Sequence, residues 1–369
     1  MKKALIHDWY YVDGGAEKVI KSFNSVWDDF DHYALVDFLN EDDRKTILNG
    51  KTVSTSFIQN LPTSRKGHQK FLQLFPIAIE QFDLKEYDLI LSSSASVAKG
   101  VLTNQDQLHI CYCHSPIRYA WDLYHQYLKE SGLDKGLKGK YAKYVLHKIR
   151  MWDIMSVNRV DHFIANSNYI ARRIKKIYGR ESTVIYPPVD TQLFTLNKNK
   201  EDYYFTASRM VPYKKMELII RAFNGMPNKK LIVAGHGPEF SKLNKIAKQN
   251  IEFLGFVSEK EIINHLQNAK AFVYAAEEDF GIVPVEAQAC GTPIICYAKG
   301  GLLETVINGE TGVHFYQQTE KAIQNSIEIF ERMDFDADVI RKNALRFSTY
   351  RFENEIKSFV EKKYMEFKR

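Results

Sequence analysis

The sequence lacks the features that mark secreted, disulfide-stapled or membrane-spanning proteins. Its 369 residues include only four cysteines, without framework spacing, which favours a reducing compartment. No stretch approaches the ~20 consecutive apolar residues of a transmembrane helix. The opening segment, Met1–Asp8, reaches charged residues too soon for a signal peptide. We therefore expect a cytoplasmic protein.

An even distribution of charge is also missing. The formal net charge is +6, but residues 131–180 hold twelve Lys or Arg against three Asp or Glu, a local +9. Apolar residues recur among these lysines at roughly helical spacing: Leu137, Tyr141, Tyr144, Val145 and Ile149. A basic amphipathic helix over 135–150 predicts contact with an anionic membrane surface, peripherally at the inner face of the plasma membrane. The alternative is that the stripe packs on its own domain. Nucleic acid is not expected, because no recognised nucleic-acid module accompanies the charge.

The length and the pattern of apolar runs indicate two α/β domains. A chain of 369 residues is longer than one core usually serves. Short apolar runs alternate with helical patterns, as in βαβ units. The runs that predict strands are 3–7, 89–91, 109–113, 162–165 and 183–185, then 203–207, 230–234, 251–254, 271–275 and 293–296. Paired prolines at Pro187 and Pro188, followed by a polar stretch, give the best linker. We place the domains at 1–187 and 188–350.

Two glutamates, Glu278 and Glu286, bracket the junction between a predicted strand and a predicted helix. Glu278 lies in the loop leaving the strand 271–275, and Glu286 lies on the first turns of the helix after Gly281. Ligands of open α/β sheets bind at such junctions. Free backbone N–H groups at a helix start suit a phosphate, and carboxylates accept hydrogen bonds from hydroxyls. A ligand with phosphate at one end and many hydroxyls at the other is a nucleotide sugar. The pair taken alone also fits a solvated helix face.

Two cations stand at a second junction of the same kind. Arg209 and Lys214 follow the strand 203–207 and precede a helix. An arginine fork and a lysine point charge at the edge of a sheet can converge on a diphosphate. A solvated basic turn is the alternative.

Other motifs exclude two cofactor classes. Gly235 and Gly237 follow a strand, but Phe240 stands where the third glycine of a dinucleotide-binding turn is needed. Cys111, Cys113 and the adjacent His114 do not have tetrahedral zinc spacing. We therefore expect neither a nicotinamide cofactor nor a metal.

Together these segments resemble the motifs of glycosyltransferase family 4, retaining transferases with two Rossmann-like domains facing a deep interdomain cleft (the GT-B architecture). The resemblance covers almost the whole chain. It implies that Glu286 holds the donor ribose, that Glu278 orients the sugar hydroxyls, and that Arg209 and Lys214 stabilise the leaving diphosphate. It also implies that a terminal helix at 351–367 returns to the first domain.

The same resemblance assigns further donor-binding positions. Gly14 and Gly15 resemble the glycine loop that faces the diphosphate, and His114 resembles a histidine near the donor sugar and the reacting centre. The remaining positions belong to the second domain: Gly235, Gly237, Phe256, Val257, Gly281, Ile282 and Val283. No cofactor and no essential metal are implied.

A narrower resemblance suggests the substrates. Residues 113–122 and 186–190 look like bacterial mannosyltransferases that build O-antigen and capsule. This implies GDP-mannose as donor and a polyprenyl-diphosphate-linked or oligosaccharide acceptor. The open alternatives are a UDP-sugar-dependent transferase of the same family, an epimerase or phosphorylase-like enzyme, and a non-catalytic partner of another transferase.

Overall fold

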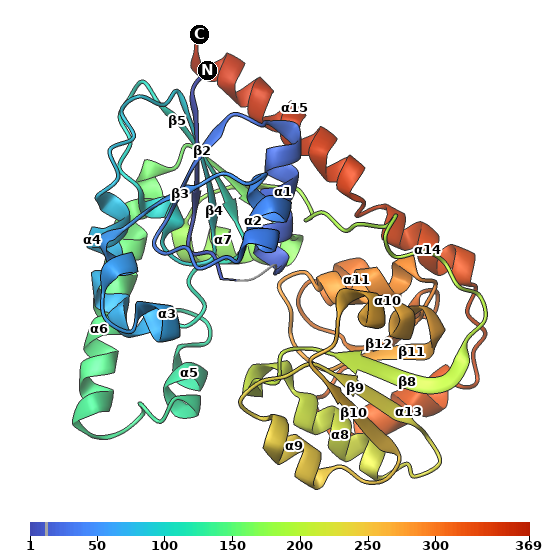
Figure 1. Cartoon of the computed structure of the whole chain (residues 1–369). Coiled ribbons are helices and arrows are strands. Elements are labelled where there is room, and N and C mark those ends of the chain that lie inside the picture. The colour runs from blue at the N-terminus through green and yellow to red at the C-terminus, as the bar shows by residue number, and fades with distance from the viewer. Residues whose placement is uncertain (12–13) are drawn as a thin grey trace. The chain divides into compact units, whose positions relative to one another are not determined.

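The computed structural model describes residues 1–11 and 14–369, and the chain divides into two compact α/β units (Figure 1). The N-terminal unit comprises Met1–Pro188 together with Phe352–Arg369. The C-terminal unit comprises Val189–Arg351. The change of unit falls beside the paired prolines of the predicted linker.

The N-terminal unit is built on a seven-stranded parallel sheet of order β3-β2-β1-β4-β5-β6-β7. The strands are β1 (Lys3–His7), β2 (Phe30–Ala34), β3 (Val53–Thr55), β4 (Leu89–Ser94), β5 (Leu108–Cys113), β6 (His162–Ala165) and β7 (Ser182–Val184). The helices are α1 (Gly15–Val26), α2 (Glu41–Leu48), α3 (Ser64–Gly67), α4 (Phe75–Glu80), α5 (Tyr124–Glu130), α6 (Gly136–Ser156) and α7 (Asn168–Tyr178). Every residue of β1, β4 and β5 is buried, as expected when helices cover both faces of a parallel sheet. Figure 1 shows α1 and α2 on one side of this sheet and α4 and α6 on the other.

A helix from the end of the sequence completes this unit. Helix α15 (Thr349–Phe367) buries Phe352, Ile356 and Val360 at four-residue spacing, all fully inaccessible. They join the core cluster of Phe23 and Tyr112, whose rings each lie 5.8 Å from the Phe352 ring, centroid to centroid. The apolar stripe of α15 is therefore part of the N-terminal core.

The C-terminal unit has a six-stranded parallel sheet of order β10-β9-β8-β11-β12-β13. The strands are β8 (Glu201–Ala207), β9 (Leu231–Ala234), β10 (Ile251–Gly255), β11 (Ala269–Tyr274), β12 (Ile294–Tyr297) and β13 (Gly312–Phe315). The helices are α8 (Met216–Asn224), α9 (Phe240–Ile246), α10 (Glu259–Asn268), α11 (Ile282–Ala289), α12 (Leu302–Thr305), α13 (Glu320–Phe330) and α14 (Ala337–Leu345). Helices α8, α9 and α13 cover one face of the sheet, and α10 and α11 cover the other (Figure 1).

The predicted fold class is confirmed: both units are parallel α/β sheets of the Rossmann type. All ten predicted strands coincide with observed strands, and their ends agree to within three residues. The prediction missed β2, β3 and β13. Strand β2 (FDHYA) carries polar residues within its run, β3 is a three-residue edge strand, and β13 opens with glycine, so each lacks a long apolar run.

Candidate functional site

The predicted donor-binding residues of the C-terminal unit all follow carboxyl ends of its strands. The order of the sheet reverses between β8 and β11, which lie side by side although β9 and β10 separate them in sequence. Ligands of open α/β sheets bind outside the carboxyl ends at such a point. The loop after β8 carries Arg209 and Lys214, and the loop after β11 carries Glu278. Topology therefore brings together Lys214 and Glu278, which lie 64 residues apart in the sequence.

Lys214 and Glu278 meet directly. The Lys214 Nζ lies 2.5 Å from the Glu278 Oε1, and the Tyr274 hydroxyl donates to the same oxygen at 2.6 Å. Lys214 also donates to the Tyr274 hydroxyl at 3.2 Å. Both charged side chains are mostly buried, with 18% and 16% of their surfaces exposed. This cluster of cation, carboxylate and phenol is fixed by three mutual hydrogen bonds.

The protonation states in the cluster follow from its charges. Burial lowers the pKa of Lys214, but the Glu278 carboxylate, with Tyr274 and Tyr213 nearby, outweighs burial and holds that pKa above its usual value. Burial and the Glu278 carboxylate together raise the pKa of Tyr274. At neutral pH the cluster therefore holds an ammonium and a neutral phenol, so it can donate hydrogen bonds to an anionic ligand.

The loop that carries Arg209 is held by the glycine turn after β9. Met210 N–H donates to the His236 carbonyl at 3.0 Å, and Glu239 N–H donates to the Met210 carbonyl at 3.2 Å. A Cβ on Gly235, whose φ is +118°, would lie 2.0 Å from the Ser208 carbonyl oxygen. A Cβ on Gly237 would lie 2.5 Å from the Met210 carbonyl oxygen. The turn thus needs glycine so that two backbones can touch, and this contact positions the exposed Arg209.

A second glycine turn, which follows β12, holds the Glu278 loop. The sequence did not predict this contact. Gly300, with φ +75°, forms a parallel bridge with Glu278, and Gly301 N–H donates to the Glu278 carbonyl at 2.8 Å. A Cβ on Gly300 would lie 2.1 Å from that carbonyl oxygen. The turn after β12 therefore fixes the backbone from which the catalytic candidate Glu278 projects.

Helix α11 begins next to this loop. Gly281 is its N-cap, in the left-handed region at φ +93°, and a Cβ there would meet the Leu302 side chain at 2.7 Å. The amides of Ile282 and Val283 open the helix, while Pro284 contributes no N–H. Glu286 lies one turn further along and is 4% exposed. The start of helix α11 suits an anion. Because Glu286 is buried, it does not lie on a solvated face of the helix.

Phe256 and Val257 follow β10. The Phe256 side chain is 88% exposed, and Ser258 then caps α10 through a capping box with Glu261. A large apolar ring kept in solvent by a short loop is a surface on which a base can stack.

In the N-terminal unit, His114 follows β5. Its Nε2 lies 2.8 Å from the Ser93 hydroxyl at the end of β4. Burial, reinforced by nearby His7, lowers the pKa of His114 to about 3, so the imidazole is neutral near pH 7. The pKa of His7 is shifted in the opposite direction. Burial lowers it, but the Glu17 carboxylate, 3.7 Å away, outweighs burial, so the pKa of His7 lies above its usual value.

The predicted glycine loop lies at the start of α1. Gly14 is the N-cap, and a Cβ there would lie 2.8 Å from the Glu17 carboxylate. Gly15 is the first helical residue. The residues just before the loop, 12–13, lie outside the described part of the chain.

Sequence reasoning missed the polar groups that support the predicted residues. Tyr274, the last residue of β11, bonds both Lys214 and Glu278. Asp8, just after β1, accepts four backbone N–H bonds of 2.6–2.9 Å from residues 95–98, and so fixes the loop after β4. Their positions directly at strand ends are the signal that was available. Among residues 1–11 and 14–369, no group of three or more His, Cys, Asp or Glu is arranged to hold a metal.

Two all-parallel units, with charged and glycine-rich loops at the carboxyl ends of their strands, define the chain as a GT-B type protein. Two family models match it: "Glycosyltransferase Family 4" over residues 14–193 and "Glycosyl transferases group 1" over residues 189–347. Together they span residues 14–347, and the chain belongs to glycosyltransferase family 4.

Curated relatives share part of the sequence. The chain is 30% identical over 217 residues to a GDP-mannose-dependent monoacylated alpha-(1-6)-phosphatidylinositol monomannoside mannosyltransferase of Corynebacterium glutamicum, covering 50% of this chain and 55% of that protein. It is 30% identical over 182 residues to D-inositol 3-phosphate glycosyltransferase of Mycobacterium tuberculosis, covering 42% and 38% respectively. The chain thus spans about half or less of the length of these relatives.

Solved structures share the fold over the whole chain. An Anabaena HepE structure in complex with UDP and glucose has a TM-score of 0.71 at 19% identity, covering 98% of this chain and 100% of that one. Sucrose-phosphate synthase from Thermosynechococcus elongatus has a TM-score of 0.72 at 15% identity, covering 99% and 100%. At these identities the likeness concerns the fold.

Proposed function

We propose that this glycosyltransferase is a retaining enzyme that transfers mannose from GDP-mannose to a polyprenyl-diphosphate-linked or oligosaccharide acceptor during assembly of a bacterial surface polysaccharide. The observation that carries the proposal is the Lys214–Glu278–Tyr274 cluster, with Arg209 on the same loop as Lys214. A buried ammonium beside a carboxylate and an exposed guanidinium suits a ligand that joins a diphosphate to a sugar.

In this proposal the C-terminal unit holds the donor. Arg209 and Lys214 bind the diphosphate, the α11 start at Gly281 donates backbone N–H groups to it, and Glu278 accepts from the sugar hydroxyls. Glu286 accepts from the ribose, and Phe256 with Val257 lies along the base. Without donor the charge of Lys214 is neutralised by Glu278, so the diphosphate would share that ammonium.

The proposed reaction is a front-face substitution. The acceptor oxygen bonds to the anomeric carbon as the bond from that carbon to the phosphate oxygen breaks on the same face. The departing phosphate oxygen takes the acceptor proton, so no protein nucleophile is required. Negative charge grows on the diphosphate, where Arg209 and Lys214 lower the barrier most. Because the Nε2 of the neutral His114 is engaged by the Ser93 hydroxyl, its Nδ1 is left to make one hydrogen bond to the sugar.

The choice of GDP-mannose is supported by the donor named for the Corynebacterium relative and by the mannosyltransferase-like segments 113–122 and 186–190. A UDP-sugar is the second candidate, because HepE was solved with UDP and with UDP-glucose.

A nucleotide-sugar screen tests the proposal. GDP-mannose at ~100 times its dissociation constant should stabilise the protein by about 2.7 kcal/mol, measured as a thermal shift, and UDP-glucose and UDP-galactose should not. Purified protein should then release GDP slowly from GDP-mannose. Stabilisation and hydrolysis only with a UDP-sugar would replace the donor while keeping the reaction class. Binding without release of nucleoside diphosphate, with or without acceptor, would favour a non-catalytic partner.

The proposed reaction needs no metal, because Arg209 and Lys214 supply the positive charge. Donor hydrolysis should therefore be unchanged in excess EDTA. Loss of activity that magnesium or manganese restores would contradict this part of the proposal.

A further inference from the structure

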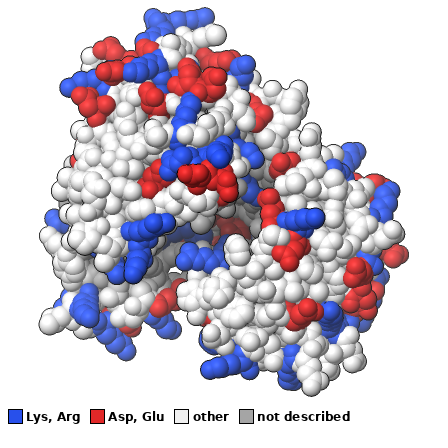
Figure 2. All heavy atoms as spheres, viewed as in Figure 1, with Lys and Arg blue, Asp and Glu red and all other residues white. Residues whose placement is uncertain are grey.

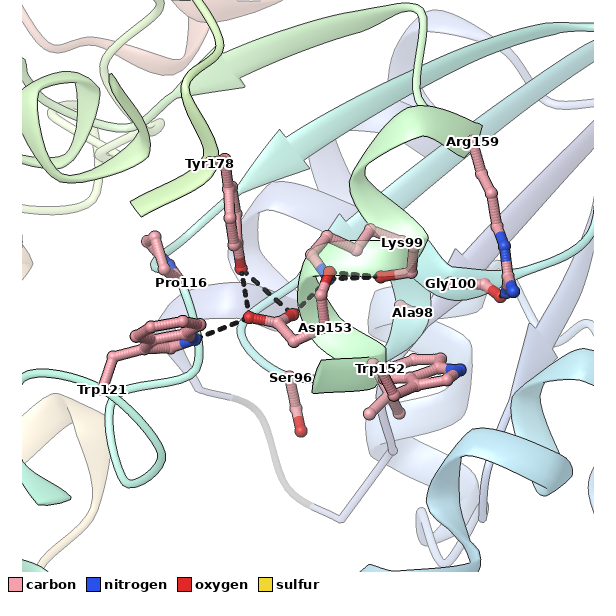
Figure 3. A network of polar contacts seen from close by, with 12 residues as sticks. Ser96, Ala98, Lys99, Gly100, Pro116, Trp121, Trp152, Asp153, Arg159 and Tyr178 are labelled. Atoms are coloured by element: carbon pink, nitrogen blue, oxygen red, sulfur yellow. Dashed lines mark hydrogen bonds and ion pairs between the residues drawn. The ribbon is translucent and has the colours of Figure 1, made fainter. Parts of the chain in front are cut away.

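One face of helix α6 packs against the rest of the N-terminal unit and holds the helix in place. Leu146 and Ile149 are buried, as is Asp153, which is wholly inaccessible. Asp153 is ion-paired with the equally buried Lys99 and accepts a hydrogen bond from Trp121 Nε1 at 2.7 Å (Figure 3). The Tyr178 hydroxyl donates to it at 3.1 Å. Because these partners come from three other segments, the orientation of α6 about its own axis is set.

The opposite face of α6 presents large apolar side chains to solvent. The exposed residues recur at intervals of four, three, four, three and four, which is one stripe of an α-helix. We call the stripe the α6 face; its members are Leu137 (83% exposed), Tyr141 (57%), Tyr144 (58%), Lys148, Met151 (46%) and Met155 (68%). From Leu137 to Met155 it extends about 27 Å. The sequence had assigned Val145 and Ile149 to the same stripe, but Ile149 points into the core and Val145 is half-buried.

The exposed charges on α6 itself have one sign. Lys138, Lys140, Lys143 and Lys148 are exposed on α6, and Asp153, its only carboxylate, is withdrawn into the buried pair with Lys99. Figure 2 shows lysine and arginine spheres among uncharged ones at lower left, where Figure 1 places α5 and α6. Among the described residues, no helix combines the length and the hydrophobicity that a membrane span needs.

We propose that the α6 face docks the N-terminal unit on an anionic membrane surface. Tyrosines and methionines enter the headgroup boundary, where an amphipathic ring is favoured, and the lysines beside them pair with lipid phosphates. Lysine stems lie along the apolar stripe while their ammonium groups reach the headgroups. A second copy of the chain is a poorer occupant, because two like-charged faces would oppose each other.

Co-sedimentation with vesicles tests the electrostatic part. The full-length protein should bind vesicles of phosphatidylglycerol and phosphatidylcholine (3:7) at low salt, release with added salt, and not bind phosphatidylcholine alone. Lys140→Glu/Lys148→Glu should weaken binding roughly thirtyfold or more, from about tenfold per 1.4 kcal/mol and about 1 kcal/mol per lysine. Lys176→Glu/Lys357→Glu, with the same charge change on exposed positions of α7 and α15, should bind like the wild type. Equal losses of vesicle binding in both double variants would mean that net charge alone drives binding, and would overturn the proposal that the α6 face docks on the membrane.

Insertion of the apolar stripe has its own readout. Measured as the difference from the wild type, whose four tryptophans also emit, the emission added by Tyr144→Trp should shift to the blue on vesicles and be quenched by brominated anionic lipid. Tyr144→Ser/Met155→Ser should bind the anionic vesicles several-fold more weakly despite unchanged charge. An emission that stays solvent-like on bound vesicles would contradict the stripe's contact with lipid. If sedimentation velocity instead reveals a dimer that these substitutions dissociate, the face is a self-interface and the proposal is wrong.

This inference goes beyond the proposed reaction and fails separately from it. None of the substituted residues belongs to the proposed donor site, so donor hydrolysis without vesicles should be the same in all variants. Normal hydrolysis with no vesicle binding would reject the docking surface alone.

Discussion

At the scale of single residues, buried neutral histidines link the stability of the N-terminal unit to pH. Burial lowers the pKa of His32, His68 and His109 to about 4 each, and that of His114 to about 3. All four lie in the N-terminal unit. Once unfolded, each ring takes up a proton below about pH 6.5, whereas the folded ring stays neutral until about pH 4. Acid therefore favours the unfolded unit, and stability falls as pH drops from 6.5 towards 4.

His32 offers the sharpest test. Burial first, and then Lys51, lowers its pKa, and neither ring nitrogen has a hydrogen-bond partner among the described residues. His32→Leu should remove about 2 kcal/mol of the stability lost between pH 8 and pH 5, measured by urea unfolding at both pH values. The exposed His125→Leu should leave the pH dependence unchanged. An unaltered slope in His32→Leu would show that this ring is not a source of acid sensitivity.

The proposed diphosphate cations make a second prediction at this scale. Arg209→Ala or Lys214→Ala should lower the turnover number by roughly 10²–10³, the cost of removing one preorganised charge-stabilising group. Glu286→Ala should instead mainly weaken donor affinity, because ribose contacts are alike in ground and transition states. Arg221→Ala, an exposed cation on α8 that pairs with Glu217, is the matched control. Steady-state kinetics with GDP-mannose separate these outcomes, and a fall in affinity alone for Arg209→Ala and Lys214→Ala would assign them to ground-state binding.

At the scale of elements, the predicted site depends on glycine turns that pack against the loops carrying Glu278 and Arg209. Gly300→Ala places a Cβ 2.1 Å from the Glu278 carbonyl oxygen at a positive φ, so the Glu278 loop must move. We expect donor affinity to fall at least about tenfold, with an added cost of about 1–3 kcal/mol in stability. Isothermal titration with donor and thermal unfolding measure the two effects.

Gly309→Ala is the matched control for that turn. Its φ is also positive, at +85°, but its Cβ would meet only the Met333 methyl at 3.9 Å. It should cost stability without changing donor affinity. Equal affinity losses in both variants would mean that backbone strain, and not displacement of Glu278, weakens binding.

The same turns show why the sequence predicted only part of the site. Arg209, Lys214 and Glu278 could be placed at strand ends, because short apolar runs and glycine or proline stops mark those ends locally. That Lys214 bonds Glu278, and that Gly300 holds Glu278 while Gly235 holds the Arg209 loop, depends on the order of strands in the sheet. Strand order arises from long-range packing, which no local pattern encodes.

At the scale of the whole molecule, two parallel sheets were predictable because alternating strand and helix patterns repeat on both sides of one linker. The role of α15 was expected only from the family resemblance. The apolar stripe of α15 indicates that Phe352, Ile356 and Val360 are buried, but it does not indicate which unit they pack against. The core cluster around Phe23 and Tyr112 supplies that information.

The discontinuous N-terminal unit therefore depends on the end of the chain, whereas the C-terminal unit is one continuous segment, Val189–Arg351. Phe352→Ala should cost the N-terminal unit about 3–5 kcal/mol, because it opens a cavity between α1, β5 and α15. Hydrogen exchange should accelerate in β1, β4 and β5 and remain unchanged in β8 and β11. Tyr350→Ala, two residues away on α15 but 77% exposed, should alter neither set. Faster exchange spread equally over both sheets would show that the two units unfold as one cooperative body; confinement to the first sheet would show that α15 stabilises the N-terminal unit alone.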